Sequence, residues 1–537
     1  MFDRILTNCT VWTLDPARPA AGAVGLRGDR IAAVGRPDDL LPGATRKTIV
    51  DDLGGGTLLP GFEDAHLHWQ WTAASLQQVN LMNVPSKQEA VRLVAEHAAA
   101  SPGSGWVQGS GWAQGPWEGG EFPTAEDLDA VLPDRPVCLR ARSGHAIWVN
   151  SLALRMAGID EHTPDPPGGE ILHRPDGKPT GLLLETAEDL VKAHIPSPTT
   201  EELAGWMLHA QELAWQCGLT SVQDLDGPPA FEAMQLLHSR GQLGIRIVKH
   251  IKDTYIQHAY GLGLKPGFGD EWLSIGALKF FADGALGPVS ALMIEPYEGQ
   301  PENTGISLLD EQQMLDLAME GTRRGFASAV HAIGDLAVRR VLDVFEKVRA
   351  EEARLGIPRD TRRHRIEHLQ LVHPDDVHRC AELDVIASIQ PIHGTEDYPM
   401  ADRYWGERAR LSYNARAQLD AGARVAFGSD APVERFEPLH GIHAAVTRRR
   451  LDGSPGPEGW YPEARLTVEE AVEGFTRGAA YSAGLEHQRG TLAPGFLADM
   501  VVLDRDPRTV DPHDIPHLRV RGTMTGGIWR HGEWCGG

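Results

Sequence analysis

Cysteine is scarce in this sequence and forms no motif. The chain has 537 residues, of which only 5 are cysteines: Cys9, Cys138, Cys217, Cys380 and Cys535. The number is odd, the positions are widely scattered, and no C-x-x-C pair occurs. These features exclude a disulfide framework and a cysteine-based zinc site, and they are typical of a reducing compartment. We therefore expect a cytoplasmic protein.

Long apolar runs and basic clusters are also missing. No stretch approaches the roughly 18 apolar residues that a membrane span needs, and Met1–Arg4 is not followed by a long apolar core. The formal net charge is −23, and we expect the densest basic run, Arg448–Arg450, to be a solvated helix end. We expect no membrane and no nucleic acid as partners, but a small-molecule substrate and a homo-oligomer, in the form of a dimer.

Short β-like segments occur at both ends of the chain. Residues 1 to about 57 contain runs such as Thr10–Leu14 and Arg30–Val34, separated by turns, and they show no helical period. Residues 488–537 contain similar runs, such as Ala498–Asp504. Each half is too small to bury a core alone. We predict one small β-sandwich domain assembled from residues 1–57 and 488–537.

Apolar strand-like segments alternate with helical stretches in the rest of the chain. The composition, with 42% hydrophobic and 23% charged residues, is that of a globular protein. Helices are predicted at residues 311–324 and 336–350, and the alternation is typical of parallel βα units. Eight strands are the number that closes a barrel. We predict an α/β fold, a (β/α)8 TIM barrel over residues 58–487, with strands at residues 58–68, 219–224, 245–251, 275–282, 327–331, 365–369, 385–389 and 424–429.

One interval is too long for a single connection between strands. It runs from about residue 70 to 216 and contains its own helix at residues 87–100, a Gly- and Trp-rich loop, and a strand-like run at residues 137–140. We interpret it as an insertion on the carboxyl-end face of the barrel, where loops build the active sites of such folds.

Two histidines stand two positions apart in the segment Leu58–Trp69. Residues i and i+2 of a strand point to the same face, so His66 and His68 can converge on one divalent cation. A lone pair of this kind also occurs as two solvated loop histidines. Ligand-type residues, however, lie in or at the ends of four later strands: Lys279, His331, His368 and Asp430. Such groups are costly at the mouth of an apolar strand unless they are paired, and one metal centre would pair them all.

The ordered set of these six residues resembles the amidohydrolase superfamily, in which they follow barrel strands 1, 4, 5, 6 and 8. The split β domain and the long insertion after strand 1 are similar to the branch that contains YtcJ-like proteins and N-substituted formamide deformylases, amidohydrolase family 3. The resemblance covers essentially the whole chain. Its metal motifs are specific as a set, whereas its substrate motifs are not.

The resemblance implies two divalent ions, expected to be zinc. The His-x-His pair would hold one ion with Asp430, the two later histidines would hold the second, and Lys279 would bridge both as a carboxylated lysine. A free ammonium cannot ligate, because it is a donor only. Taken singly, Lys279 could instead pair with Asp283, and each later histidine could be a hydrogen-bonded core residue.

The implied mechanism is attack of a metal-bound hydroxide on a carbonyl. Asp430 would accept the proton of the attacking water and return it to the departing amine. His145, in the segment Ser143–Asn150, is a candidate catalytic donor to the oxyanion and a candidate substrate contact. A structural histidine in the insertion is the alternative.

Tryptophans are numerous near the predicted site. The chain has 14, and five lie just after the histidine pair or in the insertion: Trp69, Trp71, Trp106, Trp112 and Trp117. Aromatic walls favour flat or apolar ligands. We predict that Trp69 and Trp71 contact an aromatic or bulky apolar group of the substrate. The alternative is that the tryptophans pack the insertion.

The sequence therefore predicts a metal-dependent hydrolase that cleaves a non-peptide carbon–nitrogen bond, in an amide or N-formyl group. A lactonase or carbamate hydrolase would use the same machinery. A cyclic amidine deaminase would lack the bridging lysine and would have a glutamate near His331, where this chain has Asp335. A metal-free scaffold protein would have lost ligands, and none of the six is missing.

Overall fold

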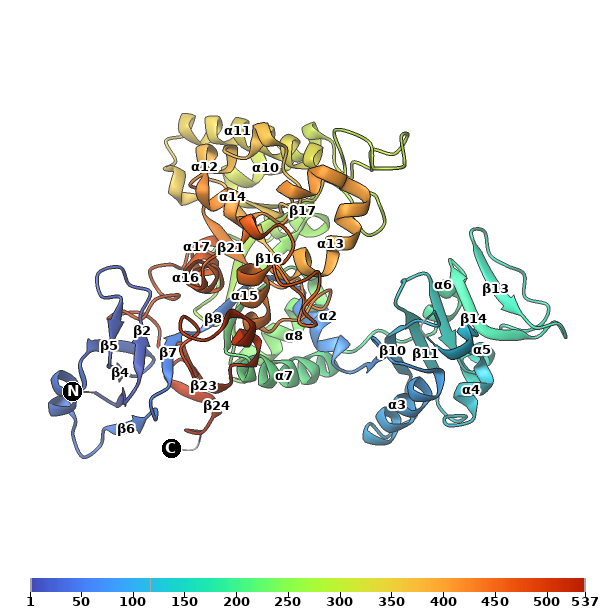
Figure 1. The fold of residues 1–537 in the computed structure, drawn as a ribbon, viewed down its shortest axis with the longest axis horizontal. Coiled ribbons are helices and arrows are strands. Elements are labelled where there is room, and N and C mark those ends of the chain that lie inside the picture. The colour runs from blue at the N-terminus through green and yellow to red at the C-terminus, as the bar shows by residue number, and fades with distance from the viewer. Residues whose placement is uncertain (1, 116, 536–537) are drawn as a thin grey trace. The chain divides into compact units, whose positions relative to one another are not determined.

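A computed structural model describes residues 2–115 and 117–535 of the chain. The chain forms two compact units, one made of Met1–Thr72 with Met207–Gly537, and the other of Ala73–Trp206. The first unit contains a β domain and an eight-stranded sheet, and the second has a six-stranded sheet of its own. Figure 1 shows the elements of each unit, with the second in blue-green.

Both ends of the chain contribute strands to the same β domain. Its two sheets have the orders β5-β4-β1-β6 and β24-β23-β22-β7-β2-β3. The C-terminal β22 pairs antiparallel with the N-terminal β7, where Val501 faces Leu59. Apolar residues of both ends share one core, among them Leu6, Met500 and Trp529. The strands are β1 (Arg4–Thr7), β2 (Thr10–Trp12), β3 (Ala20–Ala21), β4 (Ala23–Arg27), β5 (Arg30–Gly35), β6 (Ile49–Asp52), β7 (Thr57–Pro60), β22 (Met500–Leu503), β23 (Val520–Thr525) and β24 (Ile528–Gly532).

Eight strands of the first unit form the barrel. They run parallel in the order β8-β15-β16-β17-β18-β19-β20-β21. Each overlaps one predicted strand, and the predicted (β/α)8 fold is confirmed. The strands are β8 (Phe62–Leu67), β15 (Leu219–Asp224), β16 (Arg246–Lys252), β17 (Leu273–Phe281), β18 (Ser328–Ala332), β19 (Arg365–His368), β20 (Ile386–Ile389) and β21 (Val425–Phe427).

The predicted strand 58–68 is two strands in the structure. Its first part, β7, pairs with β2 and β22 of the β domain, and its second part, β8, pairs with β15 of the barrel. The chain changes sheets at Gly61, where an added Cβ would lie 2.2 Å from Cγ2 of Thr220. Only glycine allows this close approach of the backbone to the neighbouring strand. The sequence pattern could not show the change, because both strands are apolar and buried.

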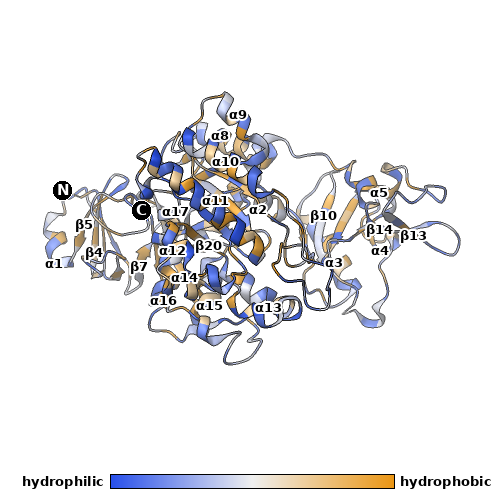
Figure 2. Cartoon of the chain, turned by 90° about the horizontal axis from the view of Figure 1, so that it is seen from above, coloured by the Kyte–Doolittle hydropathy of each residue, from blue (hydrophilic) through white to orange (hydrophobic). Residues whose placement is uncertain are grey.

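Amphipathic helices connect the barrel strands. Helix α10 (Glu311–Arg324) begins after Asp310, whose side chain accepts the N–H of Gln313 at 2.8 Å, and it ends at Gly325 with φ +103°. The predicted helix 336–350 lies within α11 (Asp335–Arg354). Figure 2 shows both hydrophilic and hydrophobic residues along α11. Its buried residues recur at intervals of three or four, as one apolar face requires: Val338, Val341, Leu342, Phe345 and Val348.

The other helices range in length from 4 residues in α1 to 17 in α7. Over residues 2–115 and 117–535, no helix is both long and apolar enough to span a bilayer. The remaining α-helices are α1 (Pro37–Leu40), α2 (Trp69–Ser75), α3 (Lys87–Ala100), α4 (Ala125–Asp129), α5 (Ser151–Met156), α6 (Glu188–Lys192), α7 (Thr200–Gln216), α8 (Pro228–Ser239), α9 (Ile256–Gly261), α12 (Arg379–Leu383), α13 (Pro391–Trp405), α14 (Ala415–Asp420), α15 (Pro438–Thr447), α16 (Val468–Glu473) and α17 (Ala479–Ser482).

The second unit has its own sheet and core, in the order β13-β14-β12-β11-β10-β9. Trp112, Trp117 and Trp148 lie in one buried cluster with ring centroids 6.2–6.5 Å apart. Each indole N–H donates to a backbone carbonyl, so these rings pack the unit itself. The strands are β9 (Val79–Asn80), β10 (Val107–Trp112), β11 (Val137–Ala141), β12 (Ala146–Val149), β13 (Gly169–His173) and β14 (Pro179–Glu185).

We predict that the buried ion pair between Arg246 and Asp499 holds the β domain on the barrel. Arg246 of β16 donates from Nε and Nη2 to the carboxylate of Asp499, at 2.6 and 3.0 Å, and both side chains are almost inaccessible to solvent. Arg246→Ala leaves a buried carboxylate without its partner, and we expect a loss of about 3–5 kcal/mol in unfolding free energy.

Denaturant unfolding measures this loss. The matched control is Arg354→Ala, which breaks an exposed pair with Glu351 and should cost less than about 1 kcal/mol. Equal losses in the two variants would contradict the role of Arg246.

Candidate metal centre

The barrel closes at the residues that were predicted to bind metal. Beyond the ends of β8 and β21, the backbone N–H of Asp430 donates to the carbonyl of His66 at 2.7 Å, and the N–H of His68 donates to Ala431 at 2.9 Å. The Nε2 atoms of His66 and His68 each lie 3.4 Å from Oδ1 of Asp430. The first and last barrel strands therefore bring three of the six predicted ligands together.

The later histidines join the same cluster. The ring of His368, at the end of β19, has its centroid 4.6 Å from that of His66 and 4.6 Å from that of His331 on β18. Ligand atoms of His66, His368 and Asp430 all lie within 4.8 Å of one another. Residues that are up to 364 positions apart (66 to 430) thus converge, because the carboxyl ends of parallel strands meet at one face of a barrel.

Each of the four histidines has one ring nitrogen held by an acceptor. His66 and His68 donate from Nδ1 to Glu367 at 2.5 Å and to Asp226 at 2.9 Å. His331 donates from Nε2 to the carbonyl of Gly284 at 2.9 Å, and His368 donates from Nδ1 to the amide oxygen of Gln390 at 2.8 Å. The second nitrogen of each neutral imidazole then carries a lone pair, as a metal ligand must.

In the neutral form that ligates a metal, His66 and His68 would each direct the Nε2 lone pair at the carboxylate of Asp430. Two acceptors at 3.4 Å repel each other unless a cation lies between them. Ligands about 2.0–2.1 Å from a tetrahedral zinc ion are roughly 3.4 Å apart. The donor set and its spacing therefore fit a divalent cation.

Lys279 of β17 is fully buried beside this cluster. Its Nζ has no hydrogen-bond partner among residues 2–115 and 117–535. Burial lowers its pKa to about 8. The alternative partner, Asp283, is occupied, since its carboxylate accepts the backbone N–H groups of Leu292, Ile333 and Gly334. A pair between Lys279 and Asp283 is therefore not formed.

Burial and neighbouring charges set the protonation of the cluster. Burial lowers the pKa of His331 to about 3, and burial with the neighbouring histidines keeps that of His368 well below its usual value. Burial alone would raise the pKa of Asp430, but hydrogen bonds from His393, His66 and His68 hold it well below its usual value. For His68, burial opposes protonation, while Asp226 and Asp430 raise its pKa to about 9. His331, His368 and Asp430 are thus in their ligating forms at neutral pH, whereas a metal ion would displace a proton from His68.

Sequence reasoning missed three residues of the centre. Asp226 and Glu367 accept from the first two histidines, and His393, in the first turn of α13, donates from Nε2 to Oδ2 of Asp430 at 3.2 Å. The sequence did contain a pattern that could have found two of them. Asp226 and His393 lie just after the ends of β15 and β20, and the predicted ligands likewise lie at or near the carboxyl ends of barrel strands. Glu367 lies one position before His368, in a strand that is buried throughout.

The two tryptophans next to the histidine pair differ in exposure. Trp71 is 54% exposed, and its ring stacks on that of His68 with centroids 4.7 Å apart and planes 19° apart. The side chain of Trp69 is fully buried, which favours packing for this ring. Its contact with a substrate stays a prediction.

His145 belongs to the second compact unit. Its Nδ1 lies 3.1 Å from the carboxylate of Glu185, and both side chains are exposed. Its role as an oxyanion donor and substrate contact stays a prediction.

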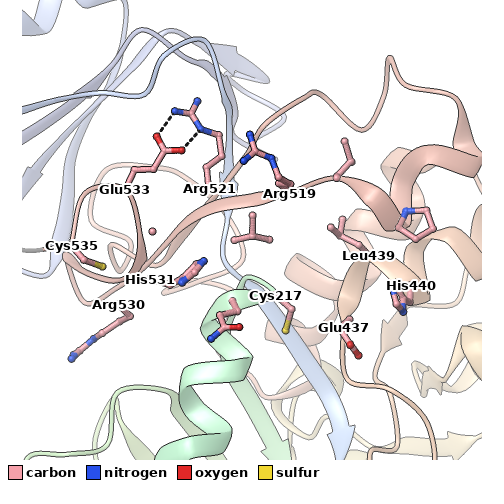
Figure 3. A pocket seen from close by; sticks show the side chains of 15 residues that line it. Cys217, Glu437, Leu439, His440, Arg519, Arg521, Arg530, His531, Glu533 and Cys535 are labelled. Atoms are coloured by element: carbon pink, nitrogen blue, oxygen red, sulfur yellow. Dashed lines mark hydrogen bonds and ion pairs between the residues drawn. The ribbon is translucent and has the colours of Figure 1, made fainter. Parts of the chain in front are cut away.

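A sizeable cavity lies elsewhere, at the amino end of a barrel strand. Its volume is about 840 Å³, and its described lining contains none of the six predicted ligands. Figure 3 shows Cys217, which precedes β15, beside Glu437 and His440 and across from Arg519 and other residues of the C-terminal strands. Active sites of such barrels lie at the opposite, carboxyl-end face, so this cavity is not the metal centre.

Comparison with known proteins assigns the chain to a family. A family model described as "Amidohydrolase family" matches residues 50–528. The chain is 34% identical to Protein LONG AFTER FAR-RED 3 of Arabidopsis thaliana, over 98% of this chain and 91% of that protein. The chain belongs to the amidohydrolase family.

Other relatives of this amidohydrolase span nearly its whole length. It is 32% identical to the putative amidohydrolase YtcJ of Bacillus subtilis, over 93% of this chain and 96% of that protein. It is 29% identical to N-substituted formamide deformylase of Arthrobacter pascens, over 99% and 98%. A solved structure of an uncharacterized metal-dependent hydrolase from Pyrococcus furiosus superposes with a TM-score of 0.78 at 28% identity, over 94% of this chain and 100% of that one. This amidohydrolase therefore has the fold of a metal-dependent hydrolase and is an enzyme that hydrolyses carbon–nitrogen bonds.

We predict that the purified enzyme binds about two divalent ions per chain, since its nitrogen and carboxylate ligands suit zinc. Elemental analysis measures the number and identity of the ions. Lys279→Ala should lower the metal content, whereas His378→Ala, which removes an exposed histidine outside the centre, should leave it unchanged. A fully active preparation without bound metal would contradict the assignment.

Proposed function

We propose that this amidohydrolase hydrolyses the carbon–nitrogen bond of a small non-peptide amide or N-formyl compound. The observation that carries the proposal is the convergence of four histidines and Asp430, in which each histidine has one ring nitrogen held by an acceptor other than Asp430. The relation to N-substituted formamide deformylase over 99% of the chain supports the N-formyl class.

We assign the His-x-His pair with Asp430 to one metal position, and His331 with His368 to a second. Lys279 would join the two positions as a carboxylated lysine. Its buried, unpartnered Nζ and lowered pKa support this role, because the neutral amine is the form that reacts with carbon dioxide, and a carbamate provides the acceptor oxygens that an ammonium lacks. When bound, the metal ions lower the pKa of water toward neutrality and polarise the substrate carbonyl.

The two oxygens of Asp430 have different surroundings. Oδ1 faces the Nε2 atoms of His66 and His68, and Oδ2 accepts from Nε2 of His393. The side chain is thus held at the centre with its charge retained. We propose that Asp430 accepts the proton of the attacking water and returns it to the departing amine, and that His393 keeps the carboxylate oriented for both steps.

Hydrolysis of lactones or carbamates uses the same residues, and a substrate panel with all three classes distinguishes it. Deamination of a cyclic amidine is less well supported. Such deaminases lack the bridging lysine, whereas this chain has Lys279 at that position. Asp335, which stands where they would have a glutamate near the histidine, accepts the backbone N–H of Ile294 at 2.9 Å.

Asp430→Asn tests the proton transfer. We expect turnover to fall by roughly 10²–10⁴-fold with much of the metal retained, because asparagine preserves the shape but cannot act as the base. Asparagine also accepts the left-handed backbone of this position, φ 59°. Asp384→Asn is the matched control, with φ 51° outside the centre, and it should keep full activity. Near wild-type turnover in Asp430→Asn would remove Asp430 from the proton transfer.

Trp71→Ala tests whether the substrate carries an aromatic or bulky apolar group. The exposed ring on His68 should favour an N-benzyl formamide over N-methylformamide in wild type, and the variant should lose kcat/KM mainly for the N-benzyl substrate. Trp69→Ala should affect both substrates alike if its buried ring only packs. Phe268→Ala, which removes another exposed ring (65%) before the amino end of β17, is the control. Equal kcat/KM for the two substrates in wild type would exclude the aromatic contact.

A further inference from the structure

The four histidines of the centre are not held by equal partners. Those of the His-x-His pair donate to carboxylates, Glu367 and Asp226. Those of the second position donate to neutral oxygens, the carbonyl of Gly284 and the side-chain amide of Gln390. The two proposed metal positions therefore differ in the charge of the acceptors that hold their histidines.

Glu367 is charged and immobile. It is fully buried, and its second oxygen, Oε1, lies 2.5 Å from Nε of Arg365. Arg365 is held in turn by the side chain of Gln223 at 2.6 Å and the carbonyl of Ala65 at 3.1 Å. A carboxylate held between a buried guanidinium and an imidazole nitrogen cannot rotate away, so Glu367 fixes the orientation of the His66 ring through Nδ1.

Asp226 is held as firmly at His68. Its Oδ2 accepts the backbone N–H groups of Gln70 at 2.6 Å and Trp71 at 3.4 Å, in the first turn of α2. The nearby ammonium of Lys249 pairs with the carboxylate of Asp224 at 2.6 Å and donates to the main-chain carbonyl of Asp226. The Asp226 side chain is therefore fixed in place against Nδ1 of His68.

A charged acceptor on the far nitrogen makes an imidazole a stronger ligand than a neutral acceptor does. The His66–His68 position also contains Asp430, so its ligands and their partners carry three carboxylates, those of Asp430, Glu367 and Asp226, and Glu367 is paired with the guanidinium of Arg365. At the His331–His368 position the hydrogen-bond acceptors are neutral. The nearest described carboxylate, Asp283, lies 3.6 Å from Nε2 of His331, beyond hydrogen-bond distance, and its oxygens accept backbone N–H groups instead.

We propose that Glu367 and Asp226 are positioning residues that make the two metal positions unequal. The His66–His68 position has the higher affinity, and the His331–His368 position loses its ion first. The inference rests on the proposed two-metal centre. It concerns the relative affinity of the two positions, which the proposed function leaves open.

The experiment removes metal stepwise from the purified holoenzyme with increasing dipicolinate and measures the remaining zinc by elemental analysis. Wild type should lose its ions in two steps. Crystals that retain one ion per chain should show anomalous density beside His66 and His68. Density beside His331 and His368 instead would overturn the proposal.

Two charge-removing variants, Asp226→Asn and Glu367→Gln, should weaken the retained ion by roughly 10–100-fold. Gln390→Glu makes the opposite change, giving His368 a charged acceptor, and it should bring the two steps of metal loss closer together. Asp376→Asn is the matched control, because Asp376 is a buried carboxylate paired with Arg339 and Arg379 outside the centre. It should leave both affinities unchanged.

Circular dichroism of each variant separates loss of fold from loss of metal. Folded Asp226→Asn and Glu367→Gln with the wild-type two-step curve would overturn the proposal, as would equal weakening of both ions. Failure of the proposed function is a distinct result, since wild type itself would then bind no metal or would hydrolyse no amide, formamide, lactone or carbamate.

Discussion

The centre depends on the closure of the barrel between its first and last strands. The N–H of Asp430 reaches the carbonyl of His66 only because β21 lies beside β8, and the same contact places the Asp430 carboxylate 3.4 Å from two imidazoles. Asp64 reinforces the closure, since its Oδ1 accepts the backbone N–H groups of His66 and Ser429. Backbone hydrogen bonds, which are indifferent to sequence, thus position the side chains that carry the chemistry.

Closure brings many polar groups into the barrel, and the fold pairs most of them. Arg365 contacts Glu367, Gln223 and Ala65, and Gln223 also donates to Glu63, which Arg489 holds. A buried charge without such a partner costs several kcal/mol. Lys279 is the exception at the centre, since its Nζ has no hydrogen-bond partner among residues 2–115 and 117–535.

The insertion shows where composition misleads. Its tryptophans follow the histidine pair in the sequence, yet Trp112 and Trp117 pack the core of the second unit with Trp148. Within the first unit, Trp71 stacks on His68, while its neighbour Trp69 is buried. Adjacent residues of one type therefore have different surroundings, because side chains one or two positions apart in the first turn of a helix point in different directions.

The sequence by itself determined the elements and the ligand types. Apolar runs of strand length, amphipathic helices such as α11, and histidine, lysine or aspartate in or at the ends of five strands are local patterns, and local patterns follow from backbone periodicity and burial. Only the tertiary structure decided that β7 and β8 are separate strands, that Asp283 turns away from Lys279, and that Asp226, Glu367 and His393 hold the ligands. Each of these depends on a contact between segments distant in the chain, such as Glu367 with His66 across 301 positions, and no local pattern records which distant strand a side chain will meet.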